Sequence, residues 1–321
     1  MRLLVTGGAG FIGSHLCERL ISDGHTVTAF DDFSTGRPSN LRNLKDIGEF
    51  TLREGSILDR SLLNPLVQKA DYVFHLAAAV GVFNIVNNPL TSLLTNIRGT
   101  ENVLEAAYTR NTPVLVTSSS EVYGKNTSDS LKESDDRILG SPVTLRWSYS
   151  EAKAIDESLA YAYFIEKQLE TRIVRFFNTV GPRQLGAYGM VVPRFVKSAI
   201  ANEPVTIYGN GTQTRCFAHV YDVTDAVIAI AFAPNTIGKV INIGNDFEIS
   251  INELAQRVID ETNSKSKIVY VPYAEAYGEG FEDMERRVPN IDLIKKLVGW
   301  QPKRDLSTII ADISSEMQKA F

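Results

Sequence analysis

The chain has 321 residues, of which 44% are hydrophobic and 22% charged, with a formal net charge of −5. This acidic balance argues against a nucleic-acid partner, which would require a basic face, and no apolar run approaches the ~20 residues that span a bilayer. Two distant cysteines, Cys17 and Cys216, exclude a disulfide scaffold and lack metal-ligand spacing. A strand at residue 2 would leave no room for a signal peptide. We therefore expect a cytoplasmic protein with no metal site and no membrane partner.

The first segment combines a buried strand, a glycine-rich turn and a helix. A short apolar run, Leu3–Val5, is followed by three glycines with a regular spacing: Gly7, Gly10 and Gly13. Such glycines allow a tight turn, close approach of the backbone to a pyrophosphate, and close packing of helix on strand. The helix N-terminus behind them attracts phosphate. This pattern predicts a dinucleotide site that includes Phe11 and Ile12.

An acidic pair follows the second expected strand, residues 25–30. Asp31 lies about 20 residues beyond the glycines, where the fingerprint places the carboxylate that binds the ribose hydroxyls. Together with Asp32 it would repel a 2′-phosphate, which favours NAD over NADP. Arg37 is a counter-signal, because an arginine can accommodate that phosphate.

Strands and helices alternate along the first half of the chain. Further strands are expected at residues 50–57, 72–76, 113–116 and 171–177, and helices at residues 62–70, 94–108 and 149–166. This alternation predicts an α/β fold with a Rossmann-type, doubly wound parallel sheet. We add the following residues to the predicted cofactor site: Ser56, Ile57, Leu76, Ala77, Ala78 and Asn96.

The second half changes character and contains shorter strands and glycine-rich segments. A strand at residues 240–244 is expected to return to the main sheet, so a smaller α/β substrate-binding lobe would be interleaved with the first unit. We predict a cofactor-binding domain at residues 1–175 and a substrate-binding lobe at residues 176–321, with a soft boundary.

Two polar motifs carry the candidate chemistry. The hydroxyl run Thr117–Ser120 and Glu121 follow an expected strand directly, where ligands bind in open α/β sheets. Tyr149 and Lys153 are four residues apart and therefore share one face of a helix. For that helix we expect a capping box and an apolar stripe, formed by Ser148 with Glu151 and by Ala152, Ile155, Leu159 and Ala162, respectively.

Together, the glycines, the serine run and the Tyr149–Lys153 pair resemble the extended short-chain dehydrogenase/reductases that act on nucleotide sugars. The resemblance covers nearly the whole chain and implies NAD as the cofactor and a UDP-sugar as the substrate. It also implies a homodimer in which helices 94–108 and 149–166 pair across the interface, with Leu159 and Tyr163 in the contact. The residues that match the nucleotide-sugar pocket are Asn178, Arg183, Val192, Tyr208 and Arg215.

Within this family, the residues resemble UDP-glucuronate decarboxylases most. The 4-epimerases usually lack an acid at the position of Glu121, and the 4,6-dehydratases have Asp-Glu where this chain has Ser120-Glu121. The segment 277–289 and Arg146-Trp147 are similar to the bacterial decarboxylases of the aminoarabinose pathway. In that comparison Arg287 matches the arginine that handles the sugar carboxylate.

The resemblance implies a role for each catalytic candidate. The Tyr149 phenolate accepts the proton of the C4 hydroxyl, and Lys153 and the nicotinamide cation lower its pKa from about 10. A hydroxyl of Ser118 or Ser119 hydrogen-bonds the same sugar oxygen. With a C6 carboxylate the 4-keto sugar loses carbon dioxide, while Glu121 and Arg287 orient the carboxylate and handle the C5 proton. The alternatives are a UDP-sugar 4-epimerase and, more remotely, a non-catalytic NAD-binding regulator.

Overall fold

The computed structural model describes residues 1–81, 85, 87–186, 190–272, 275, 284 and 286–319. Its strands are β1 (Arg2–Thr6), β2 (Thr26–Asp31), β3 (Phe50–Glu54), β4 (Tyr72–His75), β5 (Val114–Ser119), β6 (Thr171–Phe176), β7 (Thr179–Val180), β8 (Val205–Tyr208), β9 (Thr214–Cys216), β10 (Ala218–His219), β11 (Val240–Ile243), β12 (Glu248–Ser250) and β13 (Ile268–Val271). Its α-helices are α1 (Phe11–Ser22), α2 (Arg60–Lys69), α4 (Pro89–Tyr108), α5 (Ser148–Lys167), α6 (Val191–Ile200), α7 (Val220–Phe232), α8 (Ile251–Glu261), α10 (Asp292–Val298) and α11 (Leu306–Lys319). Short 3₁₀ segments that matter below are η2 (Ser120–Tyr123) and η3 (Leu145–Trp147).

Seven parallel strands form the central sheet in the order β11-β6-β5-β4-β1-β2-β3. Val5 of β1 lies opposite Ala29 of β2 on one side and Phe74 of β4 on the other. The chain proceeds from β1 outward to β3 and then crosses to β4, so the strand order reverses between β1 and β4. Ligands of such sheets bind at the carboxyl ends of the strands beside this reversal. The predicted Rossmann-type sheet is confirmed.

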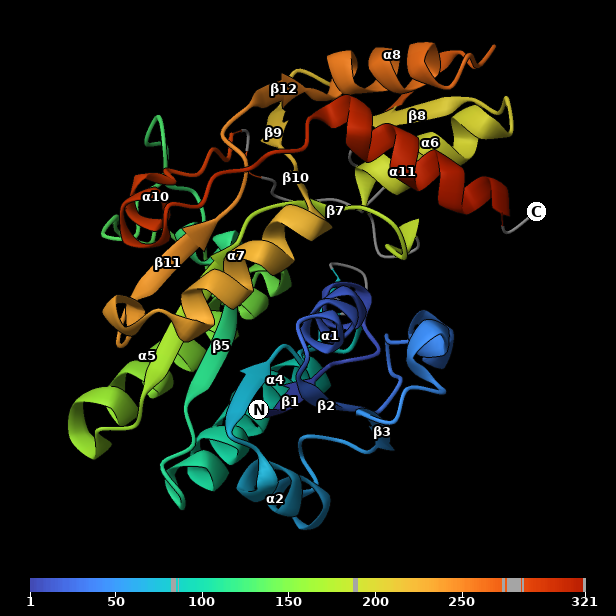
Figure 1. Cartoon of the computed structure of the whole chain (residues 1–321). Coiled ribbons are helices and arrows are strands. Elements are labelled where there is room, and N and C mark those ends of the chain that lie inside the picture. Colours follow the sequence, from blue (N-terminus) through green and yellow to red (C-terminus); the bar gives the residue numbers. More distant parts are fainter. Residues whose placement is uncertain are drawn as a thin grey trace.

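Helices cover both faces of the sheet (Figure 1). On one face α1, α7 and α10 enclose an apolar core that includes Leu16, Val227 and Ile294. On the other face α2, α4 and α5 enclose a second core around Leu63 and Leu104. Both faces are thus buried, which explains why the central strands are almost continuously apolar.

A smaller lobe lies beyond the carboxyl ends of the strands, where Figure 1 shows α6, α8 and α11 grouped around β8. Its own core includes Phe195, Leu254 and Ile309. Strand β11 comes from the second half of the chain but pairs with β6 in the main sheet, as expected for interleaved units. The division at residue 175 stays a prediction. Among the described residues, no helix is both long and apolar enough to cross a membrane.

Helix α5 differs from the prediction in two respects. It begins without a side-chain cap, because Ser148 Oγ donates to Leu145 O at 2.7 Å and Glu151 pairs with Arg137, so the predicted capping box is wrong. Its buried face combines alanines with polar residues, Lys153 among them. Of the predicted apolar stripe only Ala152 is fully buried, Leu159 is half-buried, and Ile155 and Ala162 are exposed.

Candidate active site

The turn between β1 and α1 packs glycines against neighbouring backbone. Gly7 has a φ of +70°, and a β-carbon there would lie 2.7 Å from the amide nitrogen of Ala77. A β-carbon on Gly13 would lie 2.1 Å from the carbonyl oxygen of Gly7. No described side chain caps the N-terminus of α1, whose N-cap residue is Gly10. The first amide N–H groups of α1 can therefore bind an anion.

The end of β2 fixes a carboxylate beside this turn. Asp31 is buried and accepts hydrogen bonds from the backbone amides of Ala9 and Phe33, both at 2.9 Å. Burial raises the pKa of Asp31, against the lowering effect of these amides. Asp32 lies next to it and is exposed. Arg37, which we considered as a partner for the 2′-phosphate of NADP, is exposed and does not line the cavity of the site.

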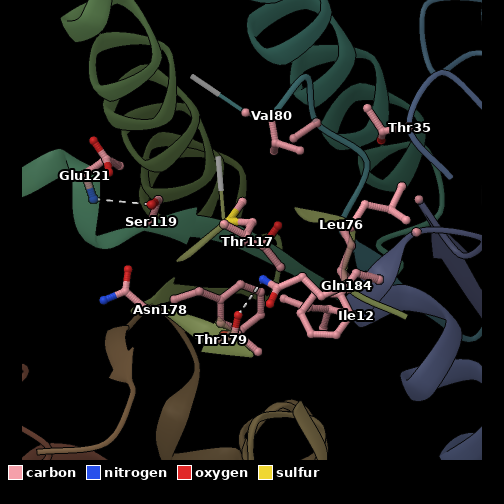
Figure 2. A pocket seen from close by; sticks show the side chains of 18 of the residues that line it. Ile12, Thr35, Leu76, Val80, Thr117, Ser119, Glu121, Asn178, Thr179 and Gln184 are labelled. Atoms are coloured by element: carbon pink, nitrogen blue, oxygen red, sulfur yellow. Dashed lines mark hydrogen bonds between the residues drawn. The ribbon is translucent and has the colours of Figure 1, made fainter. Parts of the chain in front are cut away.

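A cavity of about 500 Å³ extends from the glycine turn to the small lobe, and Figure 2 shows part of its wall. This volume is within the usual range for small-molecule sites. Most of the predicted cofactor residues line it: Gly7, Gly10, Phe11, Ile12, Gly13, Asp31, Asp32, Ile57, Leu76, Ala77, Ala78 and Lys153. All of the predicted catalytic residues line it as well: Ser118, Ser119, Ser120, Glu121, Tyr149, Lys153 and Arg287. From the predicted substrate residues the cavity adds Asn178, Arg183, Tyr208 and Arg215.

Three predicted site residues do not line the cavity. Ser56 stands in a turn, where its hydroxyl accepts from the amide of Leu58. The buried side-chain amide of Asn96 binds the backbone of Ala79 with both polar atoms. Its Oδ1 accepts from the Ala79 amide at 2.7 Å, and its Nδ2 donates to the Ala79 carbonyl oxygen at 3.3 Å. Val192 points into the core of the small lobe, while its neighbour Val191 lines the cavity. These three side chains make local hydrogen bonds or local packing contacts instead, and their place in the site stays a prediction.

Tyr149 and Lys153 lie on the cavity side of α5, as predicted. Lys153 Nζ donates to the carbonyl oxygen of Thr117 at 3.0 Å and to Asp156 Oδ2 at 3.1 Å. Burial and the charges of Glu121 and Asp156 raise the pKa of Tyr149. The protein alone therefore does not supply the lowered pKa that we expected from Lys153.

The two serines proposed for the sugar oxygen point in different directions. Both belong to β5, which extends three residues beyond the predicted end of this strand. Successive side chains of a strand face opposite ways, and Ser118 Oγ donates to the buried Glu157 at 2.5 Å. Ser119 accepts from the amide of Glu121 at 3.2 Å, as Figure 2 shows, and interacts with the Tyr149 hydroxyl. Ser119, and not Ser118, is thus the hydroxyl beside Tyr149.

Glu121 is held between two arginines in the wall of the cavity. Arg287 Nη1 lies 2.7 Å from Glu121 Oε1 and 3.2 Å from Ser120 Oγ, and Arg146 Nη2 lies 3.2 Å from Glu121 Oε2. Burial would raise the pKa of Glu121, but Arg287, Arg146 and then Arg215 outweigh it and hold the pKa at about 2. Glu121 is therefore ionised at neutral pH and lies between two guanidinium groups.

The geometry described so far agrees with a family match over most of the chain. Residues 3–244 match the model of the NAD dependent epimerase/dehydratase family. The chain belongs to this family.

Relatives of known activity extend the match. The chain is 42% identical to the UDP-N-acetyl-alpha-D-glucosaminuronate decarboxylase of Bacillus cytotoxicus over 94% of this chain and 92% of that protein. It is 36% identical to UDP-glucuronic acid decarboxylase 1 of Danio rerio over 94% of this chain and 69% of that protein. Its structure is similar to UDP-glucuronic acid 4-epimerase from Bacillus cereus, solved with UDP-glucuronic acid and NAD, with a TM-score of 0.90, 28% identity and full coverage of both chains.

The site fits the cofactor of the NAD dependent epimerase/dehydratase family. The uncapped N-terminus of α1 suits a pyrophosphate, and the space at Gly7, Gly10 and Gly13 would be reduced by any side chain. The fixed carboxylate of Asp31 offers acceptors to ribose hydroxyls. NAD is the cofactor of this family.

The remaining pocket residues are partly engaged within the protein. Arg183 donates to both carboxylate oxygens of Glu18 on α1 at 2.7 Å. Sequence reasoning missed Arg194, which lies 4.1 Å from the ring centre of Tyr208 in the cavity wall. It follows no recognisable motif, so only the fold reveals it. Segment 277–289 resembles bacterial decarboxylases in sequence. Of this segment, residues 277–283 and 285 lie outside the described residues.

Proposed function

We propose that the protein is an NAD-dependent decarboxylase of a UDP-hexuronate, either UDP-glucuronate or its 2-acetamido counterpart, acting through a 4-keto sugar. The observation that carries this proposal is the cluster in which Arg146 and Arg287 enclose Glu121 beside Tyr149. Guanidinium groups at this place suit a substrate carboxylate. The relatives at 42% and 36% identity are both decarboxylases of UDP-linked uronates, which supports the same reaction.

We assign NAD binding to the part before residue 176 and UDP-sugar binding mainly to residues 176–321. The proposed catalytic groups are Tyr149, Lys153, Ser119, Glu121 and Arg287, with Ser120 as a hydrogen-bond partner of Arg287. Ser118 supports the site through Glu157, which also pairs with Arg175. The nucleotide-diphosphate pocket would be formed by Asn178, Arg183, Tyr208 and Arg215.

In this mechanism Tyr149 accepts the proton of the C4 hydroxyl, and Ser119 orients that hydroxyl. The oxidised nicotinamide, when bound, supplies the hydride acceptor and the positive charge that favours the phenolate. The C4 ketone makes the uronate a β-keto acid. Its C5–C6 bond breaks, carbon dioxide leaves, and the electron pair forms an enolate that takes a proton at C5. C4 of the resulting keto-pentose then takes the hydride back, while Tyr149 returns its proton to the C4 oxygen.

The low pKa of Glu121 argues against its expected role in handling the C5 proton. A carboxylate whose pKa is about 2 is a weak proton acceptor at neutral pH. We therefore assign Glu121 to the orientation of Arg287 and Arg146, and not to transfer of the C5 proton. Arg287 remains the group that pairs with the substrate carboxylate.

A second candidate function is 4-epimerisation of the same UDP-uronate. It is favoured by the similarity to the UDP-glucuronic acid 4-epimerase, whose structure matches the whole chain. In that reaction the keto sugar would keep its carboxylate and take hydride back on the opposite face. Both reactions begin at Tyr149 and return NAD to its oxidised form.

The test is incubation of the purified protein with a panel of UDP-sugars: UDP-glucuronate, UDP-N-acetylglucosaminuronate and UDP-glucose. We expect one of the two uronates to yield a product lighter by the mass of carbon dioxide. Full conversion of the uronates at unchanged mass would assign the protein to the 4-epimerases. Conversion of UDP-glucose alone would move the substrate class to neutral sugars.

We further propose a cytoplasmic homodimer in which α4 and α5 pair with their counterparts. These two helices pack together and leave large apolar side chains exposed: Leu90, Tyr108, Ile155, Tyr161 and Ile165. Leu159 and Tyr163, which we expected in the interface, are already half-buried against the monomer core. The exposed set is therefore the better candidate for the contact.

A further inference from the structure

A buried carboxylate that the proposed reaction does not use lies behind the Tyr149–Lys153 pair. Asp156 follows Lys153 by one helical turn on α5, and its side chain is fully buried. Its Oδ2 atom accepts a hydrogen bond from Lys153 Nζ at 3.1 Å. A buried carboxylate is costly unless it is paired and hydrogen-bonded. Asp156 thus has its main partner in a residue of the proposed active site.

Lys153 is held from two sides. Besides Asp156, the carbonyl oxygen of Thr117 at the end of β5 accepts a hydrogen bond from its ammonium at 3.0 Å. An ammonium has three N–H donors, and these contacts use two of them. Lys153 also lines the cavity, and within the described part of the chain its ammonium donates to these two acceptors.

A series of buried polar groups connects Asp156 with the glycine turn. The Thr100 hydroxyl of α4 lowers the pKa of Asp156 and lies 3.1 Å from Nε2 of His75. Nδ1 of His75 lies 2.8 Å from Oγ1 of Thr6, the residue before Gly7. Thr6, His75, Thr100 and Asp156 are all buried. Buried polar side chains therefore lie beside Asp156, and the hydrogen bond that fixes Asp156 is the one to Lys153.

We propose that Asp156 is a positioning residue for the Tyr149–Lys153 pair: it anchors the Lys153 ammonium and withholds part of its positive charge from the Tyr149 phenol. The resting protein then keeps Tyr149 protonated. The proton acceptor forms only when the positive charge of an oxidised nicotinamide is present. This inference rests on the proposed function of Tyr149 as the proton acceptor.

The charges that face Tyr149 agree with this role. Burial is the largest cause that raises the pKa of Tyr149, followed by the carboxylates of Glu121 and Asp156, while the Ser119 hydroxyl lowers it. Glu121 is ionised and pairs with Arg287 and Arg146. Substitution of Glu121 would also disturb the arginines that pair with it. The charge of Asp156 can be removed without changing that cluster, so Asp156 is the acid to substitute.

The groups that face Asp156 itself come from its own helix, from α4 and from strand β4. On α5 it faces Lys153, which lowers its pKa, and Glu157, which raises it, after the dominant raising effect of burial. From α4 the Thr100 hydroxyl lowers it. His75 of β4 stays neutral, because burial lowers its pKa to about 3.

The test is a titration of Tyr149 in the NAD-loaded protein without any UDP-sugar. Tyrosines carry carbon-13 at the ζ position, and the Tyr149 signal is assigned by its loss in Tyr149→Phe. Asp156→Asn keeps the shape and a hydrogen-bond acceptor for Lys153 but removes the charge. We expect Tyr149 to ionise about one pH unit lower in this variant. Identical titration curves, including no titration in either protein, would overturn the proposal.

Glu151→Gln is the matched control, because Glu151 lies on the same helix but is half-exposed and pairs with Arg137 at 3.6 Å. It should leave the titration of Tyr149 unchanged, and an equal shift there would also overturn the proposal. If Asp156→Asn fails to fold, Thr100→Val removes the hydroxyl that lowers the pKa of Asp156. It should give a smaller shift in the same direction, and no shift would count against Asp156. A failure of the protein to decarboxylate uronates would leave this substrate-free result unaffected.

Discussion

At the scale of single residues, the proposal depends most on Tyr149. Tyr149→Phe removes only the phenolic oxygen, so we expect NAD binding to be retained and turnover to fall by roughly 10²–10⁴-fold. Calorimetric titration with NAD and the rate of product formation measure the two effects. Tyr161→Phe is the control, because Tyr161 lies on the same helix and is 50% exposed. Native turnover in Tyr149→Phe would show that another group accepts the proton.

Arg287 should contribute mainly to binding and orientation of the uronate. Its replacement in Arg287→Ala removes a charge-assisted contact worth ~1.5–3 kcal/mol, so we expect kcat/KM for the uronate to fall by roughly 10–150-fold. Arg286→Ala is the matched control, because the neighbouring Arg286 pairs at the surface with Glu248 at 2.7 Å. Equal losses in both variants would contradict a specific role for Arg287.

The sequence could predict which residues lie in the site where a motif fixes their positions. It could not predict in which direction their side chains point. The glycines, Asp31, Tyr149 and Lys153 could be placed in the site from spacing, because backbone geometry determines where they lie. Ser118 could not be distinguished from Ser119 without knowing how far β5 extends. Asn96 lies on a helix beside the cavity, but its amide binds the backbone of Ala79. Asp156 has no motif at all.

At the scale of elements, the contact between β1 and α1 should tolerate no added methyl group. In Gly13→Ala the new β-carbon would lie 2.1 Å from the carbonyl oxygen of Gly7. Although alanine favours helices, we expect destabilisation by roughly 1–3 kcal/mol and weaker NAD binding. Gly48→Ala is the control, because its β-carbon would meet nothing within 4 Å. Thermal unfolding with and without NAD measures both effects, and a native Gly13→Ala protein would refute the close packing.

The exposed apolar side chains of α4 and α5 should hold two copies together. We expect the wild-type protein to have the mass of a dimer by light scattering, and Ile155→Glu to shift it toward the monomer. A charge buried in an apolar interface without a partner is costly. Leu62→Glu is the control, because Leu62 is exposed to a similar degree on α2. A monomeric wild-type protein at micromolar concentration would contradict the proposed dimer.

The sequence predicted which segments are strands or helices better than it predicted where each of them begins and ends. The alternation of strands and helices follows from the hydrophobic pattern, and the doubly wound parallel sheet follows from this alternation, whereas the order of its strands is known only from the structure. The apolar stripe of α5 was misassigned because the helix covers the active site with Lys153 and Asp156 and keeps Ile155 outside. Tertiary contacts override periodicity at such a helix, since function requires buried polar groups there.

At the scale of the whole molecule, the parallel sheet places the proposed NAD site and the arginine cluster in the wall of one cavity. Strands β8 and β9 of the small lobe contribute Tyr208 and Arg215 to the same cavity. The sheet was predictable because its pattern is local. The lobe was predictable only as a region, since its short strands pair across long stretches of sequence, as β13 does with β8.

The most direct test of the proposed function follows the C6 carbon of the uronate. The protein is incubated with UDP-glucuronate and, separately, UDP-N-acetylglucosaminuronate, each labelled with carbon-13 at C6, and the label is monitored by NMR. We expect the label of one substrate to leave the sugar as carbon dioxide and bicarbonate. The cofactor should be recovered in its oxidised form at the end of the reaction. Retention of all label in a sugar carboxylate, with full conversion to a 4-epimer, would contradict decarboxylation.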